Sequence, residues 1–124
     1  MRILVVEDDA VMRDIFSIML KRAGFEVELA NDGLMGVEMW EKGDYDLVLM
    51  DVQMPRMDGF EATGAIREKE RTRGGHTHII AVTAYALEKD EKECLAAGMD
   101  AYFTKPIDFK KCLEMIRAII GQRD

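Results

Sequence analysis

DLVLMDVQMPRMDG, residues 46–59, carries the strongest fold signal in this chain. Its apolar run, Leu47-Val48-Leu49-Met50, is short and continuous, which is typical of a strand buried on both faces of a sheet. The run ends on one carboxylate, Asp51, and a turn-rich segment follows it. Because a strand covered on both faces needs helices on both sides, the stretch predicts a parallel sheet within an α/β fold.

Strand-like and helix-like segments alternate along the rest of the chain. We expect strands over residues 3–6, 25–29, 47–50, 79–82 and 101–104, and helices over residues 10–22, 34–42, 60–70, 87–97 and 109–120. Five such units predict a parallel sheet with helices on both faces, joined by right-handed crossovers. This is the flavodoxin-like (βα)5 three-layer sandwich, with strand order 2-1-3-4-5.

Two helices carry more specific expectations. In residues 10–22, Val11, Ile15, Ile18 and Met19 recur at helical spacing, and we expect them to form the buried side. A basic cluster follows the start of the third helix and is interleaved with acids, so we expect a solvated helix end. The members of this cluster are Arg67, Lys69, Arg71 and Arg73.

Composition and charge exclude several classes of protein. A length of 124 residues suits one domain, which we place at residues 1–124. No apolar run approaches the roughly 18 residues of a membrane span, and no export signal is recognisable, so we expect a cytoplasmic protein without membrane contact. The net charge of −7 disfavours direct nucleic-acid binding, because neutralising phosphates requires a basic surface.

Cysteines and histidines offer no obvious site. Cys94 and Cys112 lack metal-site spacing and fall in helical patterns, so we interpret them as inert thiols in a reducing compartment, rather than as a disulfide or redox switch. His76 and His78 lie on a glycine-rich connection without further ligands in sequence, and we therefore expect no metal site there.

The chemically capable side chains follow the predicted strands. In doubly wound sheets, sites form beyond the carboxyl ends of the strands, near the switch in strand order. All of these residues would therefore lie at one edge of the sheet. They are Glu7, Asp8 and Asp9 after the first strand, Asp51 after the third, Thr83 and Ala84 after the fourth, and Lys105 and Pro106 after the fifth.

Three acids at this edge predict a cation site. The first and third strands would be neighbours about 4.8 Å apart, so Asp51 would lie close to Glu7 and Asp8. Carboxylates that close must protonate or bind a cation, and oxygen ligands alone favour Mg²⁺ or Mn²⁺ over zinc. Together with the charge of Lys105 and the hydroxyl of Thr83, these acids and their cation could bind a phosphoryl group, and Asp51 could act as a nucleophile.

The chain resembles the receiver domains of response regulators in two-component signalling. The motifs ILVVEDD, VLMDVQMPRMDG, AVTA and YFTKP carry this resemblance across essentially the whole chain. Residues 78–108 are also similar to receivers of hybrid sensor histidine kinases. The resemblance implies a single receiver without an effector domain, phosphorylated by a sensor histidine kinase or a histidine phosphotransfer domain. It implies no enzymatic activity beyond self-phosphorylation and slow autodephosphorylation.

The resemblance also assigns a role to each acid. By this resemblance, Asp51 would be the phosphoacceptor. Asp51, Asp8 and the backbone carbonyl of Gln53 would bind Mg²⁺ directly, and Glu7 would bind it through water. Asp9 begins the following loop. Attack of Asp51 on a donor phosphohistidine would give an acyl phosphate that water later hydrolyses.

The remaining roles concern the phosphoryl group and the response to it. Thr83, the backbone amide of Ala84 and Lys105 would bind phosphoryl oxygens, and the Lys105–Pro106 peptide bond would be cis. Thr83 would move toward the new group and Tyr102 would rotate inward. The surface formed by residues 87–97, 101–104 and 109–120 would then change, and it could also form a homodimer. Gln53 and Tyr85 would tune the lifetime of the phosphorylated state.

Three other classes of protein share parts of this pattern, and the sequence disfavours each of them. A hydrolase of the haloacid dehalogenase type needs a second acid two residues after its nucleophile, where this chain has Gln53. A pseudo-receiver, a module that works without phosphorylation, would have gaps in the site, yet Asp8, Asp51, Thr83 and Lys105 are all present. A flavin-binding flavodoxin is disfavoured because the acidic loop at residues 7–9 would repel a phosphate.

Overall fold

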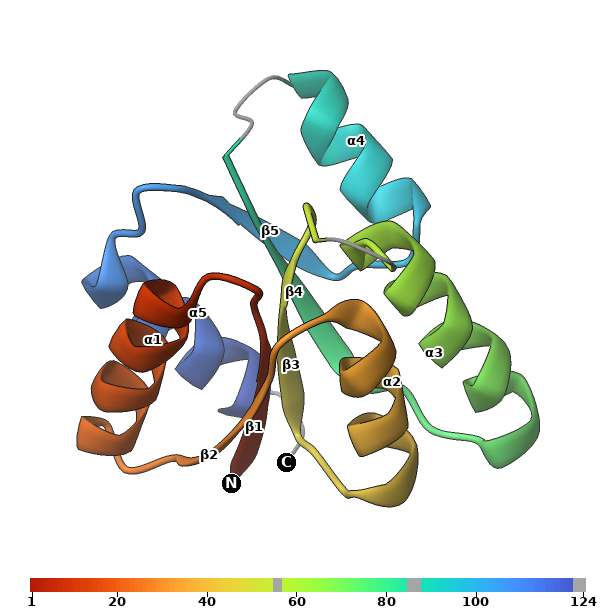
Figure 1. The fold of residues 1–124 in the computed structure, drawn as a ribbon, viewed down its shortest axis with the longest axis horizontal. Helices are drawn as coiled ribbons and strands as arrows, with labels where there is room; N and C mark the ends of the chain where they lie inside the picture. The colour runs from red at the N-terminus through yellow and green to blue at the C-terminus, as the bar shows by residue number, and fades with distance from the viewer. Residues whose placement is uncertain (55–56, 85–87, 122–124) are drawn as a thin grey trace.

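The computed structural model describes residues 1–54, 57–84 and 88–121. Strands and helices alternate along them (Figure 1). The strands are β1 (Arg2–Val6), β2 (Glu26–Ala30), β3 (Leu47–Asp51), β4 (His78–Thr83) and β5 (Ala101–Thr104), and the helices are α1 (Ala10–Arg22), α2 (Gly33–Lys42), α3 (Gly59–Arg73), α4 (Glu88–Ala96) and α5 (Phe109–Gly121). The predicted elements are confirmed, with ends that differ by at most three residues.

The five strands form one parallel sheet in the order β2-β1-β3-β4-β5. This confirms the predicted fold class. β3 is central and all five of its residues are buried, whereas β2 lies at one edge and is only partly covered. The sequence patterns therefore predicted both positions correctly. The continuous apolar run of β3 indicated a central strand, and the alternation within residues 25–29 indicated an edge strand.

The helices cover both faces of the sheet, with α1 and α5 on one side and α2, α3 and α4 on the other (Figure 1). Each face has its own apolar core. Leu4, Val48 and Met50 face Trp40 and Ile66 on the three-helix side. Ile3, Val5, Leu47 and Leu49 pack with Phe16, Leu20 and Ile116 on the two-helix side. Cys94 and Cys112 are free and buried, one in each core.

The predicted buried face of α1 is wrong. The buried residues of this helix are Phe16 and Leu20, whereas Val11 and Ile18 have 66% and 51% of their surface exposed. Residues 16 and 20 are one helical turn apart, and the ring of Phe16 packs edge-on against that of Phe109, 5.5 Å away. Two apolar stripes therefore share this helix, and only one of them faces the sheet.

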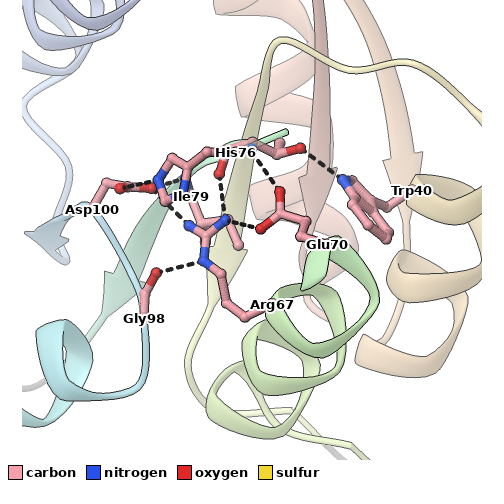
Figure 2. Close-up of polar contacts among 8 residues, drawn as sticks. Trp40, Arg67, Glu70, His76, Ile79, Gly98 and Asp100 are labelled. Carbon is pink, nitrogen blue, oxygen red and sulfur yellow. Dashed lines mark hydrogen bonds and ion pairs between the residues drawn. The ribbon is translucent and has the colours of Figure 1, made fainter. Parts of the chain in front are cut away.

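The expectation of a solvated basic cluster is wrong for Arg67. This side chain is only 18% exposed and joins three segments (Figure 2). Its guanidinium donates to Glu70 Oε1 at 2.7 Å, to Asp100 Oδ2 at 2.9 Å, and to the carbonyls of Thr77 and Gly98. The interleaved charges on α3 are typical of a solvent-exposed helix face. Arg67, however, contacts Thr77 before β4 and the turn before β5, and these segments cover it.

The rest of the basic cluster is closer to expectation. Lys69 and Arg71 make exposed ion pairs with Glu41 and Glu68. Arg73 lies over the ring of Trp40, with its guanidinium carbon 4.6 Å from the ring centroid. Within the described residues, none of the helices has the length and apolar character that crossing a membrane requires.

Candidate functional site

Four strand ends place the predicted site residues at one edge of the sheet. Glu7 follows β1, Asp51 ends β3, Thr83 ends β4, and Lys105 follows β5. The pairing of β1 with β3 ends with Val6 opposite Met50, so Glu7 and Asp51 are next in register. Parallel pairing thus brings together residues that lie far apart in the sequence.

The side chains of Glu7, Asp8 and Asp51 form a carboxylate cluster. One oxygen from each lies within 4.8 Å of the others. Glu7 and Asp51 are 1% and 4% exposed, whereas Asp8 is exposed to solvent. Two of the three acids are therefore nearly withdrawn from water, and one opens to it. The cluster matches the acids that the sequence singled out.

The loop after β1 explains why Asp9 is outside the cluster. Its carboxylate caps α1 and accepts from the amides of Val11 and Met12 at 2.9 and 3.4 Å. Arg13 donates to the carbonyls of Glu7 and Asp8 at 2.9 and 3.0 Å, and so fixes the acidic loop from behind. Sequence reasoning missed Arg13, because nothing in its position one turn into a helix distinguishes it from a solvated charge.

Lys105 joins the cluster from the far side. Its Nζ lies 3.1 Å from Glu7 Oε1 and 3.5 Å from Asp51 Oδ2. The Lys105 amide donates to the carbonyl of Thr83 at 2.7 Å, which anchors the lysine to the end of β4. The Lys105–Pro106 peptide bond is cis. The lysine therefore meets two acids from strands β1 and β3.

The proximity of Glu7 and Asp51 shifts the pKa of both. Burial, followed by the hydrogen bond and charge of Glu7, raises the pKa of Asp51 to about 8, although Lys105 opposes this. Burial also raises the pKa of Glu7, but its hydrogen bonds with Asp51, the Asp9 amide and Lys105 outweigh it, so that pKa is lowered. Without a cation, the two carboxyls therefore share one proton near neutral pH.

A hard divalent cation fits this cluster. Its donors are carboxylate oxygens, and burial together with the neighbouring Glu7 makes the ionised form of Asp51 costly without a further positive charge. Oxygen ligands of this kind suit Mg²⁺. Gln53 lies beside the cluster, where its backbone amide donates to Asp51 Oδ1 at 3.2 Å. The site can therefore hold a dication and, next to it, an anionic group that faces Lys105.

A cleft of about 580 Å³ opens beside the cluster. Asp8, Gln53 and Thr83 line it together with Asp90 and Glu93 of α4. Thr83 is buried at the end of β4, and Ala84 follows it on the surface. This opening gives a small solute a route to the acids.

Two tyrosines have expected roles, Tyr102 in the response to phosphorylation and Tyr85 in its lifetime. Tyr102 on β5 packs against the core of the three-helix side. Desolvation and the charges of Glu91, Cys94 and Asp90, all on α4, raise the pKa of its hydroxyl. Tyr85 lies outside the described residues.

Comparison with known proteins assigns this chain to one family. The family model for the response regulator receiver domain matches residues 3–117. The hybrid signal transduction histidine kinase I of Dictyostelium discoideum is 40% identical over 124 residues, which cover 96% of this chain and 7% of that kinase. For hybrid kinase B of the same organism, the identity is 46%, with 86% of this chain and 6% of the kinase covered. This chain thus spans a small fraction of these relatives.

Solved structures agree. The receiver domain of the sensor histidine kinase PA1611 from Pseudomonas aeruginosa PAO1, solved with magnesium in its active-site cleft, has a TM-score of 0.87, with 39% identity and 97% of each chain covered. The receiver domain of Ssk1 from Saccharomyces cerevisiae, crystallised with the histidine phosphotransfer protein Ypd1, has a TM-score of 0.93, with 27% identity and coverage of 99% of this chain and 90% of that one.

Proposed function

The chain belongs to the response regulator receiver domain family of two-component signalling, and we propose that it takes a phosphoryl group from a phosphohistidine onto Asp51. Receiver domains are signalling modules and not classical enzymes. One observation carries the proposal: Asp51 is a buried carboxylate whose neighbours are two acids and Lys105. We propose that residues 1–124 act as one receiver domain in this reaction.

The transfer is a substitution at phosphorus. An oxygen of Asp51 attacks, a P–O bond forms, and the P–N bond to the donor imidazole breaks, with its electrons going to nitrogen. Asp51 must first lose the proton that it shares with Glu7. Lys105, with the hydroxyl of Thr83 and the amide of Ala84, would bind the phosphoryl oxygens. Water then hydrolyses the acyl phosphate, which is the only turnover we expect.

Mg²⁺ is the cofactor that we propose, with Mn²⁺ as the alternative ion. Asp8, Asp51 and the backbone carbonyl of Gln53 would bind it directly, and Glu7 through a water molecule. When bound, such an ion neutralises negative charge on the transferring group. The magnesium in the similar PA1611 receiver supports this assignment.

The response to phosphorylation would run through Thr83 and Tyr102. The added group brings charge and strong acceptor oxygens to the end of β4. Thr83 would move toward them, and Tyr102 would turn inward from its position beside α4. The surface of α4, β5 and α5 would then shift between two populations, and a homodimer could form through it. Gln53 and Tyr85 would set how readily water reaches the phosphoryl group.

The donor would be a sensor histidine kinase or a histidine phosphotransfer domain. Val11 and Ile18 lie seven residues apart on α1, so they share an exposed apolar face on the helix that begins beside the acidic loop. We propose that a donor that presents its phosphohistidine to Asp51 covers this part of the surface. The yeast receiver crystallised with a phosphotransfer protein supports such a partner.

Acetyl phosphate tests the acceptor directly. Incubation with this donor and Mg²⁺ should raise the intact mass of the chain by one phosphoryl group. The adduct should persist in Asp9→Asn, which keeps the helix cap, and disappear in Asp51→Asn. A folded chain that forms no adduct, or an Asp51→Asn variant that still does, would contradict the proposal. Steady hydrolysis of an aryl phosphate would point to a phosphatase instead.

A further inference from the structure

Three side chains of types that commonly bind metal ions lie close together at the end of the sheet opposite Asp51. His76 comes from the connection into β4, His78 is the first residue of β4, and Asp100 comes from the turn before β5. One ligand atom from each lies within 4.8 Å of the others. His76 Nε2 is 2.7 Å from Asp100 Oδ1, and the two imidazole rings meet edge to face with centroids 5.7 Å apart. The third ligand that the sequence lacked is thus supplied by the pairing of β4 with β5.

The carboxylate of Asp100 is held in place by contacts on its other oxygen (Figure 2). Oδ2 accepts from Arg67 Nη2 at 2.9 Å and from the amide of Ile79 at 2.7 Å. Oδ1 is the oxygen that faces His76. Carboxylates that bind metals commonly have such support on the oxygen that does not bind. Asp100 is therefore oriented before any ion arrives.

The charges around Asp100 leave a negative balance. Arg67 contributes one positive charge, but Glu70 lies 2.7 Å from its guanidinium and is nearly buried. That acid also accepts from the amide of Thr77, so it is fixed in this position. Glu70 thereby compensates Arg67, and Asp100 remains as the excess negative charge that a cation would meet beside two imidazoles.

We propose that His76, His78 and Asp100 form a binding site for a borderline transition-metal dication, in the first instance Zn²⁺. Two imidazoles and one carboxylate are typical zinc ligands, and water can take the fourth position because the side chain of His76 is largely exposed. Tetrahedral bonds to zinc place ligand atoms about 3.3 Å apart. The three ligand atoms now lie within 4.8 Å of one another, so the longest separation would close by at most about 1.5 Å through side-chain rotation.

This site differs in chemistry and place from the carboxylate cluster. Imidazole ligands select zinc, copper or nickel, whereas carboxylates alone suit magnesium. A bound ion would tie the connection between α3 and β4 to the turn between α4 and β5. Because the unfolded chain does not hold these residues together, the ion would stabilise the fold by an amount that rises with the logarithm of its free concentration.

Zinc titration of the whole chain, without added histidines, tests the site. Millimolar Mg²⁺ in the buffer competes for the carboxylate cluster, and calorimetry measures zinc affinity. We expect one zinc ion per chain and an unfolding temperature that rises with zinc. His76→Gln and His78→Gln should each weaken binding by about tenfold or more, and the metal-free unfolding temperature of each variant checks its fold.

Asp51→Asn is the matched control, because it removes a carboxylate from the other cluster only. Its zinc affinity should equal that of the wild type. Loss of zinc binding in Asp51→Asn would place the ion at the wrong cluster and overturn the proposal. Equal zinc affinity in the wild type and His78→Gln would overturn it as well, as would dependence on His76 alone.

Discussion

Lys105 Nζ lies 3.1 Å from Oε1 of Glu7, closer than its 3.5 Å to Oδ2 of Asp51. The lysine thus pairs first with the acid that is not the proposed acceptor. Burial lowers the pKa of Lys105, but the two carboxylates outweigh burial and raise it, so the ammonium stays charged. This one side chain offsets part of the repulsion between the acids and stands ready for a phosphoryl oxygen.

Lys105→Gln should therefore separate two functions of the site. Loss of a charge-assisted hydrogen bond to the transferring group should slow phosphorylation by acetyl phosphate about tenfold to a hundredfold. The affinity for Mg²⁺ should rise, because a neighbouring positive charge has been removed. Rates from intact mass and calorimetric Mg²⁺ titration measure both effects. Lys110→Gln, an exposed lysine on α5, serves as the control, and equal rates in the two variants would count against this role.

Asp51→Asn should stabilise the metal-free chain in a pH-dependent way. The pKa of Asp51 is raised from its ordinary 3.8 to about 8, so between these values the folded chain holds a proton that the unfolded chain has lost. Stability contributed by this group therefore falls as pH rises from about 4 to about 8, and falls no further above that. The variant lacks this loss, so its advantage should grow by several kcal/mol between pH 4 and pH 8, at about 1.4 kcal/mol for each unit of the pKa shift.

Urea unfolding at a series of pH values, in the presence of a chelator, measures the difference between the two proteins. Comparing the difference, not the absolute stability, removes the titration of the other acids that both proteins share. A gap that stays constant from pH 4 to pH 8 would mean that Asp51 does not carry a raised pKa.

The sequence predicted the strand-end site because topology leaves little freedom there. Once strands are parallel and their order is 2-1-3-4-5, their carboxyl ends share one edge, so Glu7, Asp51 and Lys105 must meet. Short apolar runs located β1, β3 and β4, which are almost wholly buried, and alternation located the edge strand β2. This part of the site needs no knowledge of side-chain packing.

Side chains on helices were harder to place, for a physical reason. Val11 and Ile18 fit a helical period as well as Phe16 and Leu20 do, and only packing against the sheet distinguishes the two stripes. Arg67 likewise sits in a charged segment that looks solvated until β4 and β5 close over it. Charge and period are visible in the sequence, but the neighbour across space is not.

Arg67→Gln should destabilise the chain by about 2–4 kcal/mol, because it leaves Glu70 and Asp100 without their shared cation. Glutamine has a similar helix propensity, so α3 itself should persist. Arg71→Gln removes an ion pair on the same helix whose arginine side chain is 79% exposed, and should change stability by less than about 0.5 kcal/mol. Urea midpoints compare them, and similar losses would argue that the Arg67 contacts add nothing beyond surface charge.

Gly59 and Gly64 on α3 should respond in opposite directions to alanine. A Cβ at Gly59 would meet the carbonyl of Asp51 and lie 2.8 Å from Val52 Cα, so the backbone that carries the acceptor must shift. We expect a loss of about 1–3 kcal/mol and slower phosphorylation. A Cβ at Gly64 meets nothing within 4 Å, so Gly64→Ala should gain about 0.5–1 kcal/mol. Thermal unfolding and acetyl phosphate rates test both, and a neutral Gly59→Ala would contradict this close approach.

Ile18→Lys should slow phosphoryl transfer from a protein donor but not from acetyl phosphate. The exposed face of Val11 and Ile18 does not support the core, so the variant should fold normally and accept phosphoryl groups from acetyl phosphate at the wild-type rate. Transfer from a phosphorylated histidine phosphotransfer domain that is active on the wild type should slow about tenfold, because a charge replaces an apolar contact. Leu95→Lys, at a similarly exposed apolar residue on α4, is the control and should leave this transfer unchanged. If Ile18→Lys slowed both donors alike, or neither, α1 would not be the surface on which the donor docks.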